Sequence, residues 1–159
     1  MTTVLREGRL DELLATLREH PELAASSFVD DLGNQRSLLH VAVDAPGHYP
    51  RSREVIAALA AAGADPDAPF VGPHRETPLH WAASNDDVEA LEALVAAGAT
   101  LDAKGGIFAD GTPLDDALIF QQWKTARRLV ELGATVTQTH VRIAENQGNA
   151  ELAEWLEAR

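Results

Sequence analysis

A six-residue motif recurs at an interval of 35 residues and constrains the fold of this chain more than any other feature. The stretch TPLHWA at 77–82 returns as TPLDDA at 112–117, and the Gly-Ala pair at 98–99 returns at 133–134. A weaker copy lies upstream, SLLHVA at 37–42 followed by GAD at 63–65. Self-similarity at a period of about 20 to 50 residues is the signature of a repeat architecture. The sequence therefore predicts three full repeats between two degenerate ends.

Each repeat is expected to fold as two short antiparallel helices. Thr77 can cap a helix that starts with Pro78, where a missing amide hydrogen costs nothing. A second helix is predicted from apolar residues at helical spacing, namely Val88, Leu91, Leu94 and Val95. Gly98 then ends this helix, because glycine adopts a left-handed turn without steric cost. Such a pair cannot cover its own apolar face, so neighbouring repeats must stack.

On these motifs the chain resembles the ankyrin repeat family, and among its members a small stand-alone array of bacterial type. The resemblance implies an all-α solenoid of stacked helix-turn-helix pairs with projecting loops, forming one domain over 1–159. The expected units are an N-terminal capping repeat (1–34), a repeat with an inserted loop at 45–51 (35–70), two further repeats (71–105 and 106–137) and a C-terminal capping repeat (138–159). In the last unit Glu157 replaces a core valine, so that face is expected to meet water.

The resemblance also implies function, because ankyrin arrays are usually protein-binding scaffolds. A partner is expected in the concave groove and on the loops, which are called fingers in this fold. Both inner fingers are about two residues longer than is usual, and the first repeat carries the insertion at 45–51. The candidate partner-binding residues are Asp44, His48, Tyr49, His74, Glu76, Trp81, Ser84, Asn85, Asp110, Asp116, Ile119 and Phe120.

Trp81 is the expected anchor of that surface. It stands at a position that leucine usually fills, with Asp116 as its counterpart in the next repeat. A flat aromatic side chain among polar neighbours is typical of an interface hot spot. Packing between repeats is the alternative role for the same ring, and the sequence leaves both open. Trp123, by contrast, lies in the apolar stripe of a second helix and is expected in the core.

His40 and His80 occupy the fourth position of the motif, where each imidazole is expected to hydrogen-bond loop backbone and tie one repeat to the next. Asp115 stands there in the third repeat, so that tie should be altered or absent. The three residues are not expected to share a metal ion, because successive repeats lie about 10 Å apart. No metal and no cofactor is predicted.

A pocket that binds a small molecule, or an enzyme site, is the competing hypothesis. It would use Trp81 and Asp116 beneath the insertion, with His48, Tyr49 or His74 as a base. Two observations weigh against catalysis: the Asp86-Asp87 pair can cap a helix instead, and side chains of adjacent residues such as Asp115 and Asp116 point about 100° apart. No catalytic residue is assigned. A bare scaffold without its own specificity is a third reading.

Composition narrows the partner and the compartment. The net charge of −12 opposes nucleic-acid binding, and the basic clusters at 51–53 and 127–128 lie among carboxylates. An acidic surface favours a partner protein with a basic face. The chain has no cysteine and no segment that reads as a signal peptide or membrane span, so a soluble cytoplasmic protein without membrane partners is expected.

Overall fold

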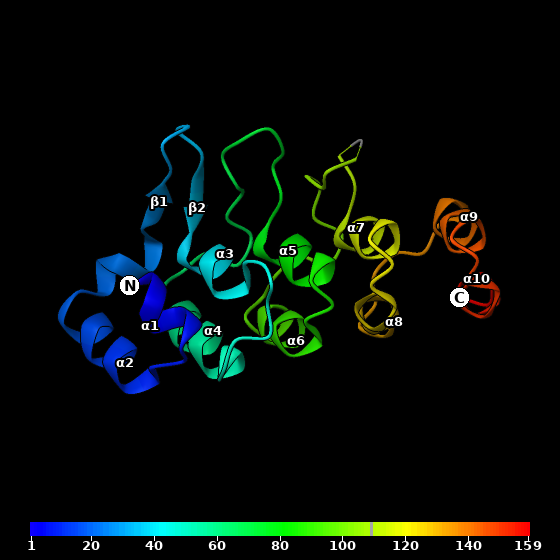
Figure 1. Ribbon diagram of the computed structural model, residues 1–159. Helices are drawn as coiled ribbons and strands as arrows, with labels where there is room; N and C mark the ends of the chain where they lie inside the picture. The colour runs from blue at the N-terminus through cyan, green and yellow to red at the C-terminus, as the bar shows by residue number, and fades with distance from the viewer. Residues whose placement is uncertain (109) are drawn as a thin grey trace.

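The computed structural model describes residues 1–108 and 110–159. Helix pairs stack in one row from the N-terminus to the C-terminus, and loops project from one side of the row (Figure 1). The pairs are α1 (Thr2–Arg6) with α2 (Leu10–Glu19), α3 (Leu38–Val43) with α4 (Ser52–Ala61), α5 (Pro78–Ser84) with α6 (Val88–Ala96), α7 (Pro113–Ile119) with α8 (Trp123–Glu131), and α9 (Gln138–Asn146) with α10 (Ala150–Glu157). A 3-10 helix, η1 (Pro21–Ala25), follows the first pair. The predicted helical repeat architecture is confirmed.

In every repeat after the N-terminal one, the first helix starts at a reciprocal cap. The Thr77 hydroxyl takes part in a capping box, and the backbone N–H of Thr77 donates to Nδ1 of His80 over 3.0 Å. The same box begins α3 at Ser37, α7 at Thr112 and α9 at Thr137. Each cap satisfies backbone groups that the helix cannot, which stabilises its start by about 1 kcal/mol. The Thr-Pro-Leu-His motif is therefore first of all a helix-start signal.

The core consists of small and branched aliphatic side chains between the helix pairs. The fully buried residues include Leu39, Ile56, Leu59, Leu79, Leu91, Leu94, Leu114, Leu118 and Leu129. Alanines at the start of the second turn, such as Ala82 and Ala117, are also fully buried and let neighbouring helices approach closely. Trp123 packs against this core but remains half-buried. The low aromatic content of the chain thus matches a core of aliphatic side chains between closely packed helices.

A β-hairpin forms the first finger, and the all-helical expectation did not include it. Strand β1 (Ser27–Val29) pairs antiparallel with β2 (Gln35–Ser37). Asp30 closes the turn, because its carboxylate accepts the backbone N–H groups of Leu32 and Asn34, each over 2.9 Å. Gln35 also exchanges backbone hydrogen bonds with Val71 of the second finger, which is the loop between α4 and α5. The third finger is the loop between α6 and α7. The hairpin thus braces the second finger.

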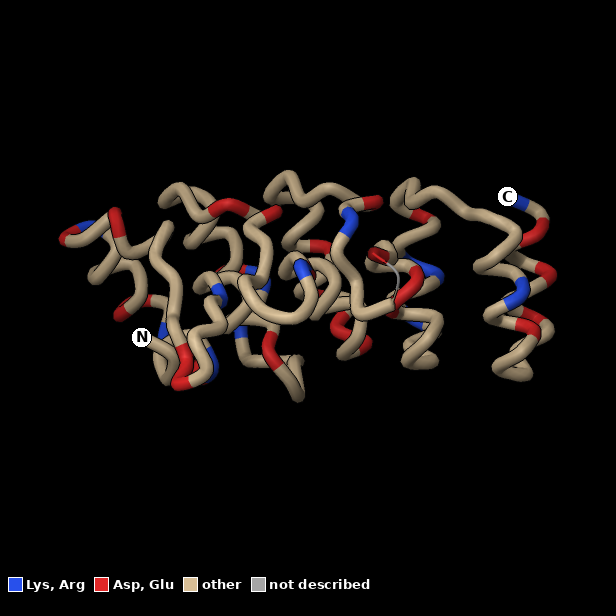
Figure 2. Tube along the Cα trace, turned by 90° about the horizontal axis from the view of Figure 1, so that it is seen from above, with Lys and Arg blue, Asp and Glu red and all other residues tan. Residues whose placement is uncertain are grey.

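Charged side chains are spread along the whole array, with basic residues lying among acidic ones (Figure 2). Glu92 is half-buried and accepts hydrogen bonds from Arg53 of α4 and Arg128 of α8, both over 2.8 Å. Arg127 pairs with Glu151 over 2.7 Å. These carboxylates neutralise the two basic clusters, so neither offers a free patch for phosphate.

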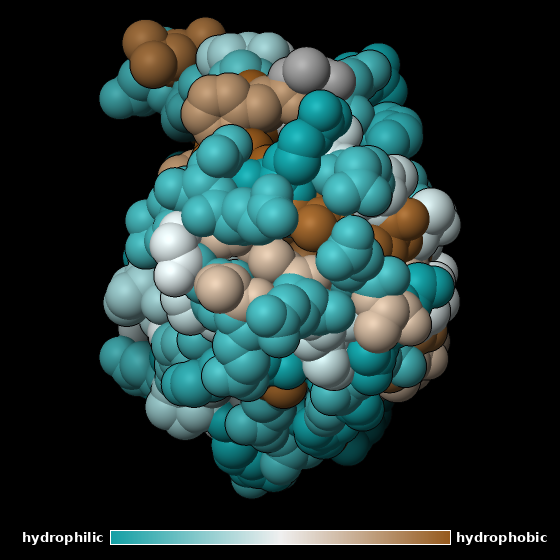
Figure 3. Space-filling model, turned by 90° about the vertical axis from the view of Figure 1, so that its right-hand side faces the viewer, coloured by the Kyte–Doolittle hydropathy of each residue, from teal (hydrophilic) through white to brown (hydrophobic). Residues whose placement is uncertain are grey.

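The C-terminal end of the row is covered mainly by hydrophilic residues (Figure 3). Glu157 is exposed there, as predicted, while Leu152, Ala153 and Leu156 turn inward. Such a polar outer face is what a capping repeat requires. Within the described ranges, no helix has both the length and the apolar character that crossing a bilayer needs.

Candidate functional site

The groove holds a pocket of about 350 Å³, called the groove pocket below. Its lining comes from the end of α3, from the base of the second finger, from α5, from the third finger and from the end of α7. The residues are Asp44, Ala45, Glu76, Trp81, Ser84, Asn85, Ile107 and Phe120. Six of them are among the candidate residues expected from the sequence. Because the lining spans three repeats, stacking itself creates the pocket.

Trp81 is half-buried and packs against two other rings. Its ring meets His40 edge-on at 4.8 Å between centroids, and the Phe70 ring lies 5.5 Å away. Trp81 also lines the pocket. These contacts fix the orientation of the indole before anything binds. The two roles weighed for Trp81, packing and surface contact, are therefore compatible in one side chain.

Glu76 is fixed through its backbone. Its carbonyl accepts the backbone N–H of Phe70 over 2.7 Å and Nε2–H of His40 over 3.1 Å. The residue is 8% exposed. Burial raises the pKa of the Glu76 carboxyl above its ordinary value, against the opposing influence of His74 and Trp81. The groove pocket thus contains a carboxylate that is desolvated but has no lysine or arginine partner among the described residues.

Asp116 was expected on the groove surface and is instead fully buried behind it. Neither carboxylate oxygen has a hydrogen-bond partner among the described residues. The third finger covers the group so closely that a Cβ atom added at Gly106 would lie 2.8 Å from Oδ1. Burial, together with the nearby Glu76 and Asp115 carboxylates, raises the pKa of Asp116 to about 7. The backbone N–H of Ile107 opposes this only in part, without forming a hydrogen bond of good geometry.

Asp44 forms the rim of the pocket, and its charge is already compensated. Its Oδ2 accepts hydrogen bonds from the guanidinium groups of Arg6, over 2.6 Å, and Arg36, over 3.1 Å. These pairs tie the N-terminal helix to the first full repeat. The uncompensated negative charge of the groove therefore lies with Glu76 and Asp116, not with the rim.

The insertion at 45–51 packs against the neighbouring repeat beside the pocket. The backbone N–H of His48 donates to Asp87 over 2.6 Å, and its Nε2 lies 3.1 Å from the carbonyl oxygen of Asn85. The Tyr49 hydroxyl donates to the carbonyl of Ala45 over 3.2 Å. Neither His48 nor Tyr49 lines the pocket. The insertion thus buttresses the turn after α5 and leaves the groove uncovered.

The remaining candidates do not line the pocket. His74 and Asp110 are exposed on the second and third fingers, and Ile119 is half-buried on α7. Asp87 caps α6 by accepting the N–H of Ala90 over 3.0 Å, as the sequence suggested for the Asp86-Asp87 pair. The set proposed for a small-molecule or enzyme site is therefore not brought together: only Trp81 lines the groove pocket, with Asp116 behind it.

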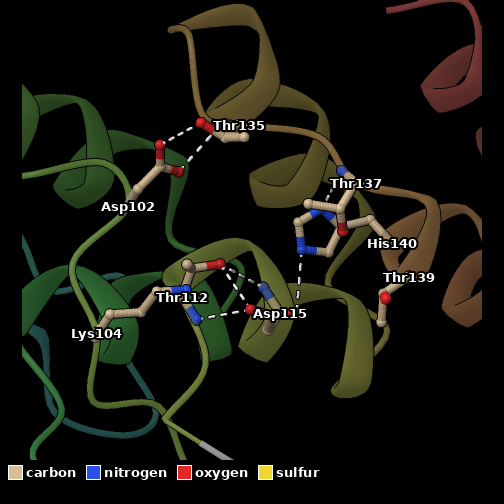
Figure 4. A pocket seen from close by; sticks show the side chains of 8 residues that line it. All are labelled: Asp102, Lys104, Thr112, Asp115, Thr135, Thr137, Thr139 and His140. Atoms are coloured by element: carbon tan, nitrogen blue, oxygen red, sulfur yellow. Dashed lines mark hydrogen bonds and ion pairs between the residues drawn. The ribbon is translucent and has the colours of Figure 1, made fainter.

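A second hollow, of about 410 Å³, lies between the third finger and α9 (Figure 4). Asp115 and His140 meet on its wall, with the Asp115 carboxylate accepting Nε2–H of His140 over 3.0 Å. The other ring nitrogen of His140 accepts the backbone N–H of Thr137 over 3.0 Å. Both nitrogens are thus occupied, so this imidazole has no free atom for acid-base chemistry. Within the described residues, no three His, Asp or Glu side chains gather as metal ligands.

A family model of ankyrin repeats, in three copies, matches residues 39–140. The chain belongs to the ankyrin repeat family. A search of curated proteins returned no significant match. Family membership explains the tethers between neighbouring ankyrin repeats: Nε2–H of His40 donates to the carbonyl of Glu76, and that of His80 to the carbonyl of Gly111 over 3.2 Å. These two ties were predicted from the motif.

Three further contacts between ankyrin repeats escaped the sequence reasoning. Asp115 and His140 form the corresponding tie between the last two repeats. His140 lies only 25 residues after Asp115, so the 35-residue period did not reveal this contact. The Asp67 carboxylate accepts hydrogen bonds from the backbone N–H and the hydroxyl of Thr100. Asp102 accepts the same two hydrogen bonds from Thr135, over 3.0 and 2.6 Å (Figure 4). These two pairs are themselves 35 residues apart, and that recurrence is the signal that could have found them.

Proposed function

We propose that this ankyrin array binds a partner protein through its concave groove, with the groove pocket as the centre of the contact. The supporting observation is that residues from three repeats converge on a pre-oriented, half-buried tryptophan. A rigid aromatic side chain beside Phe120 and the polar residues Ser84 and Asn85 has the make-up of an interface hot spot. Little ordering is needed on binding, which favours affinity.

The partner is proposed to present a basic surface. The chain carries a formal charge of −12, and its basic clusters are neutralised by neighbouring carboxylates. The long-range field therefore repels acidic partners and accelerates encounters with basic ones, most strongly at low ionic strength. Within the groove, the uncompensated charge is also negative.

Affinity capture from a lysate of the source cell, followed by calorimetry with the purified partner, tests the proposal. Trp81→Ala should weaken binding by about 2 kcal/mol, as expected for an aromatic anchor. Trp155→Ala is the matched control, because that indole lies on α10 between Arg127 and Arg159, far along the row from the groove. An affinity for the captured partner that Trp81→Ala leaves unchanged would contradict groove binding and return Trp81 to a packing role.

A small-molecule ligand is the second candidate, and the size of the groove pocket is the observation that favours it. Its volume of about 350 Å³ is sufficient for a compact organic molecule. Native mass spectrometry of the purified protein separates the two functions. A retained ligand that Trp81→Ala loses would favour the small-molecule candidate.

A further inference from the structure

The two carboxylates of the groove stand out when equivalent positions of the repeats are compared. The residue before the helix cap is Arg36, Glu76 and Gly111 in three successive repeats, and the fourth helical residue is Val41, Trp81 and Asp116. The second and third repeats thus bring Glu76 and Asp116 together across their boundary, close enough that Glu76 raises the pKa of Asp116. Gly106 leaves room for the Asp116 carboxylate, because a Cβ atom at that position would lie 2.8 Å from Oδ1.

The Asp116 carboxylate does no visible structural work. Three other buried polar side chains are satisfied: Asp87 caps α6, Thr125 donates to the carbonyl of Ala83 over 2.9 Å, and His80 ties two repeats. Asp116 is fully buried, and both of its oxygens lack a partner in the described part of the chain. A buried carboxylate without a partner is costly, and such groups in native proteins often await an ion or a ligand. Asp116 therefore points to a missing positive charge.

The pocket in front of Asp116 can admit such a charge. Three residues around the buried carboxylate also line the groove pocket: Glu76, Ile107, whose N–H lies nearby, and Phe120, one helical turn further along α7. Trp81 and Phe120 add aromatic faces to the same lining. An aliphatic stem can lie along these rings while the cation at its end reaches Glu76.

We propose that the groove pocket receives one lysine or arginine side chain of the partner protein, with its cation facing Glu76 and with Asp116 behind as a second, buried counter-charge. This inference rests on the proposed groove-binding function and specifies what the groove recognises. The two carboxylates repel each other in the free protein, and the entering cation relieves that repulsion. The site thus selects a positive side chain over an apolar one of the same length.

Binding through such a pair is coupled to protons. The cation favours the ionised carboxylates, so affinity should rise as pH increases through the range in which Asp116 loses its proton. The titratable groups near the pair are Asp115 on α7, His74 on the second finger and His40 on α3, while Asp44 is held by arginines. Burial lowers the pKa of His40 to about 4, so this imidazole stays neutral between pH 6 and 8. His74→Gln removes the exposed imidazole near Glu76, and the pH dependence should persist in that variant.

Chemical-shift titration of the ¹⁵N-labelled protein tests the proposal with short probes. The probes are the blocked tripeptides Ala-Lys-Ala and Ala-Arg-Ala, the uncharged Ala-norleucine-Ala, and n-butylamine. At pH 8 the Trp81 indole signal should shift with both basic tripeptides, and the norleucine peptide should bind at least about tenfold more weakly. Equal binding of the norleucine peptide, or no shift with either basic tripeptide, would overturn the proposal. Butylamine binding as tightly as the lysine tripeptide would also overturn it, in favour of a free small cation.

A second test uses variants that remove one charge and leave the shape of the side chain nearly unchanged. Glu76→Gln and Asp116→Asn should each weaken binding of the lysine tripeptide by about tenfold or more, and Asp116→Asn should abolish its pH dependence between pH 6 and 8. Glu157→Gln, which removes the same charge from the C-terminal cap, should have no effect. Thermal unfolding shows that each variant is folded. Unaltered affinity in both groove variants would overturn the inference.

Failure of this inference can be told apart from failure of the groove proposal. If Trp81→Ala abolishes capture of the partner protein while Glu76→Gln and Asp116→Asn leave it intact, the groove binds a partner but not through a cation. If Trp81→Ala leaves capture intact, the groove proposal itself fails, whatever the tripeptides do.

Discussion

Two adjacent aspartates on helix α7, Asp115 and Asp116, have very different surroundings. On the side of α9, Asp115 accepts hydrogen bonds from Thr112 and His140. On the groove side, Asp116 is buried without a partner. Burial alone raises the pKa of Asp115, but its bonds from His140 and Thr112 outweigh that effect and hold it well below the ordinary range. The pKa of Asp116 is raised to about 7. Asp115 thus has hydrogen-bond partners that offset its burial, whereas the more deeply buried Asp116 has none among the described residues.

Removal of Asp115 should have the largest effect on stability. Asp115→Ala takes away one half of the capping box of α7 and leaves Nε2–H of the buried His140 without an acceptor, so the free energy of unfolding should fall by about 3 kcal/mol. Urea unfolding followed by circular dichroism measures it. A loss below about 1 kcal/mol would show that the last repeat is held by its apolar contacts alone.

The neighbouring substitution should act in the opposite direction. Asp116→Asn removes a charge that the folded state accommodates poorly, so at pH 8 it should stabilise the free protein by about 2 kcal/mol. The wild type binds more protons at Asp116 when folded than when unfolded, and therefore loses stability as pH rises from about 4 to 7. The gain from Asn should accordingly vanish near pH 4. Urea unfolding at both pH values tests this, and a destabilised variant at pH 8 would remove the contrast between the two aspartates.

The preceding repeat sharpens the comparison, because His80 occupies there the position of Asp115. Burial lowers the pKa of His80 to about 4, so protons bind the unfolded chain first when pH falls below the ordinary histidine value. Stability that is present above about pH 6.5 should be lost progressively down to pH 4. Between pH 7 and 5, His80→Gln should reduce this loss by about 1 kcal/mol in thermal or urea unfolding. An unchanged slope would mean that the pKa of His80 is the same in the folded and the unfolded protein.

The smallest effect is expected at the exposed outer helices. Glu92→Gln breaks the ion pairs with Arg53 and Arg128, and the side chains of both arginines remain partly exposed to solvent. Such pairs contribute about 0.5 kcal/mol or less, and the difference should shrink in 1 M salt. A change above about 1.5 kcal/mol in urea unfolding would show that these charges act as a network.

The helices could be predicted because their signals are local. Thr77, Pro78 and Gly98 act through their own caps and turns, and the period of 35 residues repeats them. The hairpin at 27–37 escaped prediction because its strands are only three residues long, too short for an alternating pattern to be distinguished. Local rules therefore account for the repeats but not for the first finger.

The sequence predicted most of the residues that line the groove pocket but not their arrangement in space. The register of the family motif placed Trp81, Ser84 and Phe120 on one surface. The burial of Asp116 depends on Gly106 of the third finger, which folds back over it from ten residues upstream. No periodic pattern encodes that approach. His48 likewise looked available for chemistry, but its docking on Asn85 is a contact between repeats that the sequence alone does not reveal.

The most direct test of the contrast on α7 is a ¹³C NMR titration of the side-chain carboxyl carbons of Asp115 and Asp116. We predict that Asp116 titrates near pH 7 in the free protein, that its midpoint falls when the lysine tripeptide is added, and that Asp115 stays ionised throughout the folded range. A midpoint for Asp116 near 4, unmoved by the tripeptide, would contradict the account, because the groove would then hold an ordinary carboxylate with no unmet need for a cation.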